Sequence, residues 1–184
     1  MKVRFIGACI ATVVAMQPTA SVAQWYQGPS GGSGGQKFDQ WAASGGATKI
    51  ASFGVLQDSS IRCLSIFYRE TPTNPGRLTR FANGFCNRGP SELDFNGWKG
   101  VDLDRDEYII GIEGRYGDHI DALRVYTNKR SSDWFGGSGG NRTFGYTAPK
   151  GQMIVAFFGR AGENLDAIGV MYAPCPRTIA TCRT

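Results

Sequence analysis

The 184-residue sequence has a single histidine, His119, and none of its five cysteines stands in a Cys-x-x-Cys pair. Structural zinc sites take their ligands from cysteine and histidine at such short spacings. A nucleophile–histidine–acid set is also poorly supported, because the only histidine lies within a turn of its own. The sequence therefore argues against a metal centre, and we expect no cofactor and no catalytic residue.

The chain also has little concentrated positive charge. Its densest basic cluster is only Lys129-Arg130, and the net charge of +5 falls to +3 once Lys2 and Arg4 are removed. Nucleic-acid binding usually requires a strongly basic stripe, which argues against it here. No apolar run after the first residues is long enough to cross a bilayer, so we expect no membrane insertion.

Residues 1–23 have the pattern of a signal peptide. Lys2 and Arg4 give a charged start, Phe5 to Met16 form a short apolar run, and small residues at 21–23 end in Ala23. An ordinary N-terminal core segment is the less favoured alternative. We therefore expect a secreted or periplasmic protein, cleaved near Ala23, whose remaining length suits one domain.

Four cysteines remain once Cys9 leaves with the signal peptide. An even number in an exported chain indicates two disulfides, for which three pairings exist. Cys175 and Cys182 bracket a short C-terminal tail (175–184), which favours a local bond there. Cys63 with Cys86 would then form the second.

Glycine is the most abundant residue, with 26 positions, and it separates segments rich in aromatic and β-branched residues. This pattern predicts an all-β domain with many tight turns. No segment after residue 23 shows a convincing helical period. The predicted strands include residues 49–53, 61–68, 108–113, 122–126 and 153–158.

Two short motifs each occur twice. Gly162 begins a Gly-x-x-x-Asp-Ala segment whose aspartate is Asp166 and which leads into an apolar strand. Gly117 begins a near copy whose aspartate is Asp121. Gly-Gly-Ser-Gly-Gly occurs at residues 31–35 and again at 136–140. The first copy alone would be read as a flexible linker, but the second lies within the domain.

The spacing of these motifs indicates a threefold internal repeat. Each Gly-Gly-Ser-Gly-Gly loop precedes an acidic turn by 26 or 27 residues: Gly31 to Asp58 is 27, and Gly136 to Gly162 is 26. A third glycine loop is expected near residues 87–90. In that alignment the turn beginning at Asp58 carries Arg62 where the other two turns carry aspartate.

With these motifs the chain resembles the mannose-binding branch of the jacalin-related lectins, from about Gly28 to Pro174. The resemblance implies an all-β fold, the β-prism I, with three Greek-key four-stranded sheets around a pseudo-threefold axis. It also implies that the domain spans residues 24–174 and binds mannose- or glucose-containing glycans or glycoproteins. A homo-oligomer is compatible with it.

The resemblance further implies which residues bind sugar. Each site would join a glycine loop to an acidic turn of another repeat, with a carboxylate and backbone N–H groups contacting sugar hydroxyls. The expected sets are Gly35 with Asn164, Leu165 and Asp166, and Gly140 with His119, Ile120 and Asp121. The third pairing, residues 87–89 against Arg62, would be a corner without a site, held by the Cys63–Cys86 disulfide.

The resemblance also shows one departure and leaves two alternatives. Some mannose-binding relatives carry tyrosine at the middle of the turn, where this chain has Asn164 and His119. One alternative is a glycosidase using two carboxylates, although Asp121 and Asp166 would serve separate sites. The other is a prism used as a protein-binding or structural surface, for which the sequence offers Trp25, Tyr26, Trp41 and Trp98.

Overall fold

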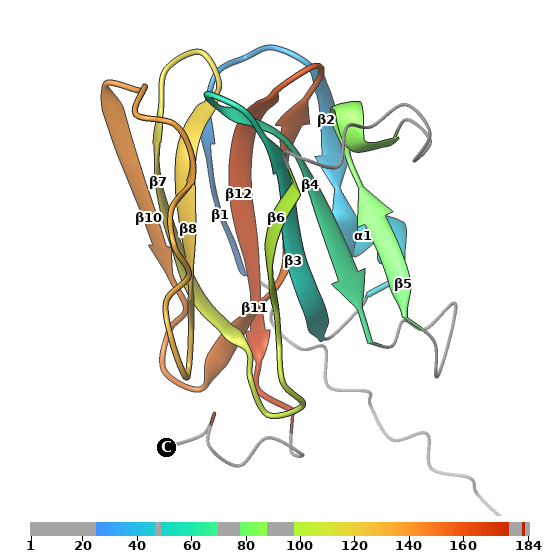
Figure 1. Cartoon of the computed structure of the whole chain (residues 1–184). Coiled ribbons are helices and arrows are strands. Elements are labelled where there is room, and N and C mark those ends of the chain that lie inside the picture. Colours follow the sequence, from blue (N-terminus) through green and yellow to red (C-terminus); the bar gives the residue numbers. More distant parts are fainter. Residues whose placement is uncertain (1–24, 47–48, 70–77, 88–97, 177–181, 183–184) are drawn as a thin grey trace, which may run out of the picture.

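The computed structural model describes residues 25–46, 49–69, 78–87, 98–176 and 182. These residues form three four-stranded antiparallel sheets arranged around a common interior (Figure 1). Sheet I has the strand order β5 (Thr79–Ala82), β4 (Ile61–Tyr68), β3 (Ile50–Gln57), β6 (Trp98–Asp102). Sheet II has the order β10 (Arg142–Thr147), β7 (Ile109–Tyr116), β8 (Ile120–Thr127), β9 (Phe135–Gly136). Sheet III has the order β1 (Trp25–Gly31), β12 (Leu165–Pro174), β11 (Gln152–Ala161), β2 (Gln36–Asp39).

Each sheet is built around a central hairpin: β3–β4, β7–β8 or β11–β12. The turns of these hairpins lie at one end of the molecule, the upper end in Figure 1. Sheet III draws on both ends of the chain, because β1 pairs with β12 and β2 pairs with β11. This pairing places the loop after β1 beside the turn after β11.

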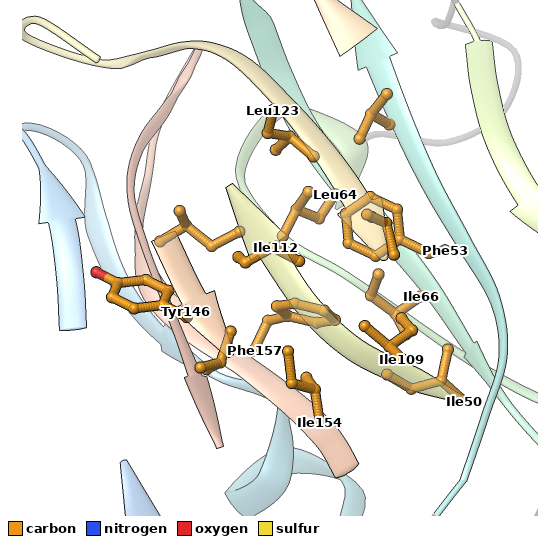
Figure 2. Close-up of a cluster of buried hydrophobic side chains, with 14 of the residues drawn as sticks. Ile50, Phe53, Leu64, Ile66, Ile109, Ile112, Leu123, Tyr146, Ile154 and Phe157 are labelled. Atoms are coloured by element: carbon orange, nitrogen blue, oxygen red, sulfur yellow. The ribbon is translucent and has the colours of Figure 1, made fainter. Parts of the chain in front are cut away.

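The strands alternate between the interior and the solvent, as half-buried antiparallel strands do. In β8, Leu123 and Val125 are fully buried, whereas Arg124 and Tyr126 are partly exposed. Three phenylalanines, one from each sheet, meet at the centre of the interior. The Phe53 ring lies 5.2 Å from that of Phe157 and 6.3 Å from that of Phe135, measured between centroids. Figure 2 shows Phe53 and Phe157 within the surrounding aliphatic cluster. The interior is thus a single apolar core shared by all three sheets.

Although no segment after residue 23 shows a helical period, the structure contains two short helices. A five-residue helix, α1 (Gln40–Ser44), follows β2, and a 3₁₀ helix, η1 (Gly84–Asn87), follows β5. Asp39 caps α1 by accepting a hydrogen bond from the Ala42 N–H at 3.1 Å. A helix this short covers little more than one turn, so it leaves no periodic pattern in the sequence. None of the helices in the described ranges is long and apolar enough to cross a membrane.

The predicted strands are all present, and most are longer than predicted. Residues 61–68 match β4, while β11 continues past Phe158 to Ala161, because Gly159, Arg160 and Ala161 pair with β2. Both predicted disulfides are present, Cys63–Cys86 and Cys175–Cys182. The predicted signal peptide lies outside the described residues.

Candidate functional site

The loop Gly31–Gly35 and the turn Gly162–Asp166 lie side by side at the end of sheet III. Strand pairing brings them together: Gly31 is in register with Ala167, and Gln36 with Ala161. The Gly32 N–H then donates a hydrogen bond to the carbonyl of Asp166 at 2.8 Å. We call this pair of segments the Asp166 site. It joins residues more than 125 positions apart, and brings Gly35 and Asp166 together as the family resemblance implied.

The Asp166 carboxylate packs directly against two backbone glycines. A Cβ added at Gly34 would lie 2.4 Å from Oδ1, and one added at Gly35 would lie 2.3 Å from Oδ2. Gly35 also has a φ of +58°, which L side chains rarely adopt. Any side chain at either position would displace the carboxylate or the loop. Glycine therefore allows the loop backbone to approach an acidic group closely.

The electrostatic environment of Asp166 is unusual for a surface carboxylate. Burial raises its pKa, and the backbone N–H of Gly162 only partly offsets the rise. Its Oδ2 atom is buried and has no hydrogen-bond partner within the described residues. A carboxylate short of donors is costly.

The same arrangement recurs at the end of sheet II and forms what we call the Asp121 site. The Gly137 N–H donates to the Asp121 carbonyl at 2.9 Å. A Cβ at Gly139 would lie 2.4 Å from Oδ1 of Asp121, and one at Gly140, whose φ is +82°, 2.9 Å from Oδ2. His119 Nε2 lies 3.7 Å from Oδ1 of this carboxylate. The two sites are therefore near copies in their backbone geometry.

A hollow of about 560 Å³ opens at the Asp121 site. It is lined by Gly117, Asp118, His119, Asp121, Ser138, Gly139, Gly140, Asn141 and Arg142. Glycine backbone, the two carboxylates of Asp118 and Asp121, and other polar side chains make up this lining, which suits a small ligand rich in hydroxyl groups.

The remaining predicted residues hold the acidic turns in shape. Leu165 and Ile120, which precede the two aspartates, are completely buried and anchor the turns in the core. Asn164 and His119 accept backbone hydrogen bonds from Gly162 and Gly117 through their carbonyls, at 2.9 and 3.0 Å. The first turn is closed in the same way, from the Asp58 N–H to the Ser60 carbonyl at 3.1 Å.

The third corner, formed by the turn that begins at Asp58, keeps the shape of the turn but lacks the aspartate of the other two. Arg62 takes the place of aspartate and lies 3.6 Å from the carboxylate of Asp58. Behind the turn, the Cys63–Cys86 disulfide packs with Leu56 and the partly buried Trp98 in a small apolar cluster. Most of the loop expected to face Arg62, residues 88 and 89, lies outside the described residues. The carboxylate that both other sites use is absent here.

Sequence reasoning missed two arginines that fasten the glycine loops. Arg160 donates to the carbonyls of Gly34 and Gly35, at 2.6 and 2.7 Å. Arg115 donates to the carbonyl of Gly137 at 2.9 Å. Both arginines lie two residues before the first glycine of an acidic turn, within a repeated Gly-Arg-x-Gly pattern at 114–117 and 159–162. That pattern was the available signal.

The residues that a two-carboxylate glycosidase or a protein-binding surface would need are less well placed. The carboxylates next to the two site aspartates, Asp118 and Glu163, are exposed. No three His, Cys, Asp or Glu residues in the described ranges cluster as a metal site would. Among the proposed surface aromatics, Trp41 and Trp98 pack against buried clusters, whereas Trp25 and Tyr26 are exposed.

Comparisons with known proteins agree with this geometry. The family model described as "Jacalin-like lectin domain" matches residues 27–171. The chain is 28% identical over 155 residues to a mannose/glucose-specific lectin from Parkia platycephala, covering 81% of this chain and 32% of the relative. It is 26% identical over 151 residues to Jacalin-related lectin 10 from Arabidopsis thaliana, covering 80% and 44%. The chain thus spans less than half the length of these curated relatives.

The solved structure of wild-type Malaysian banana lectin superposes on this chain with a TM-score of 0.66 at 27% identity. The match covers 83% of this chain and all of that one. The three open antiparallel sheets are therefore those of the β-prism I lectins, as the resemblance predicted. The named relatives are lectins rather than enzymes. The family model, the relatives and the fold agree, and the chain belongs to the jacalin-like lectin domain family.

Proposed function

We propose that this chain is an exported lectin that binds mannose- or glucose-type hexoses at two places, the Asp166 site and the Asp121 site. One observation carries the proposal. In both sites a carboxylate is held against two glycines of a loop from another repeat, with one glycine close to each of its oxygens. That arrangement presents a fixed acceptor beside an exposed glycine backbone.

The chemistry of a hexose matches this arrangement. Each of its vicinal hydroxyls is both a donor and an acceptor, and a carboxylate accepts from two of them at once in charge-assisted hydrogen bonds. The loop glycines and the turn backbones at Asn164–Leu165 and His119–Ile120 would supply the donors. Each hydrogen bond contributes only about 1 kcal/mol net, so we expect weak binding of a single hexose.

Two sites on one rigid body would increase the strength of binding to clustered glycans. The sites are close neighbours, because the loop of one contacts the turn of the other: a Cβ at Gly32 would lie 2.0 Å from the carbonyl oxygen of Asp118. Branched glycans with several terminal hexoses are therefore the natural targets. The name of the Parkia relative supports the mannose or glucose preference.

A titration with methyl α-mannoside, methyl α-glucoside and methyl α-galactoside, followed by isothermal calorimetry or NMR shifts, tests the proposal. We expect saturable binding of the first two sugars and weaker binding of the galactoside. Folded protein that binds none of them, and no glycan on an array, would refute the lectin function and favour a protein-binding module.

Export is tested separately. The leader pattern and the two disulfides support it, because disulfides persist in oxidising compartments. After expression of the full chain in a host with a secretory pathway, N-terminal sequencing of the exported protein should begin near Gln24. Retention in the cytosol with an intact N-terminus would contradict this part of the proposal.

A further inference from the structure

A second hollow lies on the outer face of sheet II, beside Trp134. Its volume is about 430 Å³, and it is lined by Glu113, Gly114, Arg115, Trp134, Thr143 and Phe144. Trp134 is 47% exposed and is one of the few large apolar side chains of the described residues that face solvent. Neither the core nor the two sites described above explains why a tryptophan stands here.

This hollow lies beside the Asp121 site, because Trp134 stands just before β9, whose Gly136 pairs with Ala122, the neighbour of Asp121. Arg115 lines the hollow and also donates a hydrogen bond to the carbonyl of Gly137 in the glycine loop. Thr143 lines the hollow, while its neighbour Arg142 lines the site and stacks 4.9 Å from the centre of the Tyr116 ring. Neighbouring residues of β10 thus contribute to the hollow and to the site.

The lining of the hollow suits a sugar ring. A pyranose has an apolar C–H face and a rim of hydroxyls, so it is complementary to an aromatic ring surrounded by polar groups. The guanidinium groups of Arg115 and Arg124 lie 5.8 and 5.1 Å from the centre of the Trp134 ring and hold it in place. The Glu113 carboxylate, which pairs with Arg124 at 2.7 Å, and the Thr143 hydroxyl are available at its edge.

The hollow has an equivalent beside the Asp166 site, whereas the matching position of the third corner carries an apolar residue. In sheet III, Arg160 and Phe158 line a hollow of about 470 Å³ with residues of β2. In sheet I, the position of Arg115 and Arg160 is occupied by Leu56, which is opposite Trp98 and packs with it and the disulfide. The hollows beside Trp134 and beside Arg160 thus each lie near a corner that keeps an aspartate.

We propose that the hollow beside Trp134 is an extension subsite of the Asp121 site, in which the next hexose of an oligosaccharide stacks on Trp134. This inference rests on the proposed function, since it requires a first hexose at Asp121. The Asp121 site would then prefer short oligosaccharides over single sugars because of contacts outside the glycine loop.

The test uses the full chain with Asp166→Ala, so that only the Asp121 site remains. Affinities for methyl α-mannoside and for linear mannobioses and mannotrioses of different linkages are measured by calorimetry or NMR. We expect at least one oligosaccharide to bind more tightly than methyl α-mannoside. The gain should exceed the statistical factor that comes from the number of its terminal hexoses. Adding Trp134→Ala should weaken that oligosaccharide about 3- to 10-fold, with less than a 2-fold change for the monosaccharide.

Two further variants keep the test decisive. Trp134→Phe retains a smaller ring and should restore part of the gain even if the alanine variant folds poorly. Trp25→Ala removes another exposed tryptophan, 57% exposed on the edge strand β1, and should change neither affinity. The subsite would be overturned if Trp134→Ala weakened monosaccharide and oligosaccharide binding equally. It would also be overturned if the affinity of the Asp166→Ala variant did not increase with the length of the oligosaccharide. A parent that binds no sugar at all would instead refute the proposed function.

Discussion

Arg115 and Arg160 show how single side chains shape the two sites. Neither reaches a carboxylate of the sites; each donates instead to backbone carbonyls of a glycine loop. Glycine loops are intrinsically flexible, and ordering them costs conformational entropy. A charged donor that holds the loop carbonyls reduces that cost before the ligand arrives. The structure therefore places these arginines as positioning residues.

Arg160→Met should weaken sugar binding at the Asp166 site about 10-fold, because charged hydrogen bonds to the Gly34 and Gly35 carbonyls are lost. The measurement uses calorimetry in an Asp121→Ala background, where only the Asp166 site remains. Arg115→Met is the matched control in that background and should leave affinity unchanged. Arg160→Lys should restore part of the affinity, and equal effects of both methionine variants would contradict a local positioning role.

Glu107 is the most strongly perturbed acid in the described ranges. It is 1% exposed and accepts hydrogen bonds from Arg130 Nε at 2.9 Å and from the Thr127 hydroxyl at 2.8 Å. The hydrogen bonds from Arg130, followed by that from Thr127, lower its pKa from 4.5 to about 2 despite its burial. Its stabilising contribution is present above about pH 4.5 and is lost as the pH falls towards 2.

Glu107→Gln should therefore lower the free energy of unfolding at pH 7, and the gap to the wild type should shrink as the pH falls from 4.5 to 2. Urea unfolding at several pH values measures both curves. A constant gap across this range would show that the ionised carboxylate is not the stabilising form.

At the scale of elements, each site consists of one glycine loop and one acidic turn, and both elements could be identified in the sequence. Repeated letters identified Gly35, Gly140, Asp121 and Asp166, since a close backbone approach needs glycine at defined positions. Their spatial pairing followed from the family resemblance rather than from spacing. The arginines were missed because their partners are main-chain carbonyls, which have no residue letter and lie up to 126 positions away.

The third corner shows the same elements adapted to a different use. Arg62 replaces the acid, and Leu56 with the Cys63–Cys86 disulfide replaces the arginine that holds a loop elsewhere. This bond joins β4 to η1 and closes a segment of 23 residues. Its contribution to stability is largely the reduced freedom of the unfolded chain.

The double variant Cys63→Ala/Cys86→Ala should lower the free energy of unfolding by about 2–4 kcal/mol, while both sugar sites keep their affinity. Denaturant unfolding and a sugar titration on the same sample measure the two effects. The matched control, Cys175→Ala/Cys182→Ala, opens a segment of only 7 residues and should cost about 1 kcal/mol less. Loss of a sugar site with the first pair would mean that this corner supports binding after all.

At the scale of the whole molecule, the glycine-punctuated strands and the visible repeats predicted an all-β domain of three units, and the family resemblance supplied their arrangement as a β-prism. What the sequence did not reveal is local and depends on context. Helix α1 is too short to leave a period, and the exposure of Trp134 depends on how the edge strand β9 pairs with β8 in sheet II. The prism places three similar corners at one end and leaves two of them with an acid facing a glycine loop.

The count of sugars bound per chain tests this account most directly. Calorimetric or NMR titration with methyl α-mannoside should give two sites in the wild type, one in Asp121→Ala, one in Asp166→Ala and none in the double variant. Glu163→Ala, which removes an exposed carboxylate of the same turn as Asp166, should keep both sites. A wild type with fewer than two sites, or one aspartate whose loss abolishes all binding in a folded protein, would contradict the account.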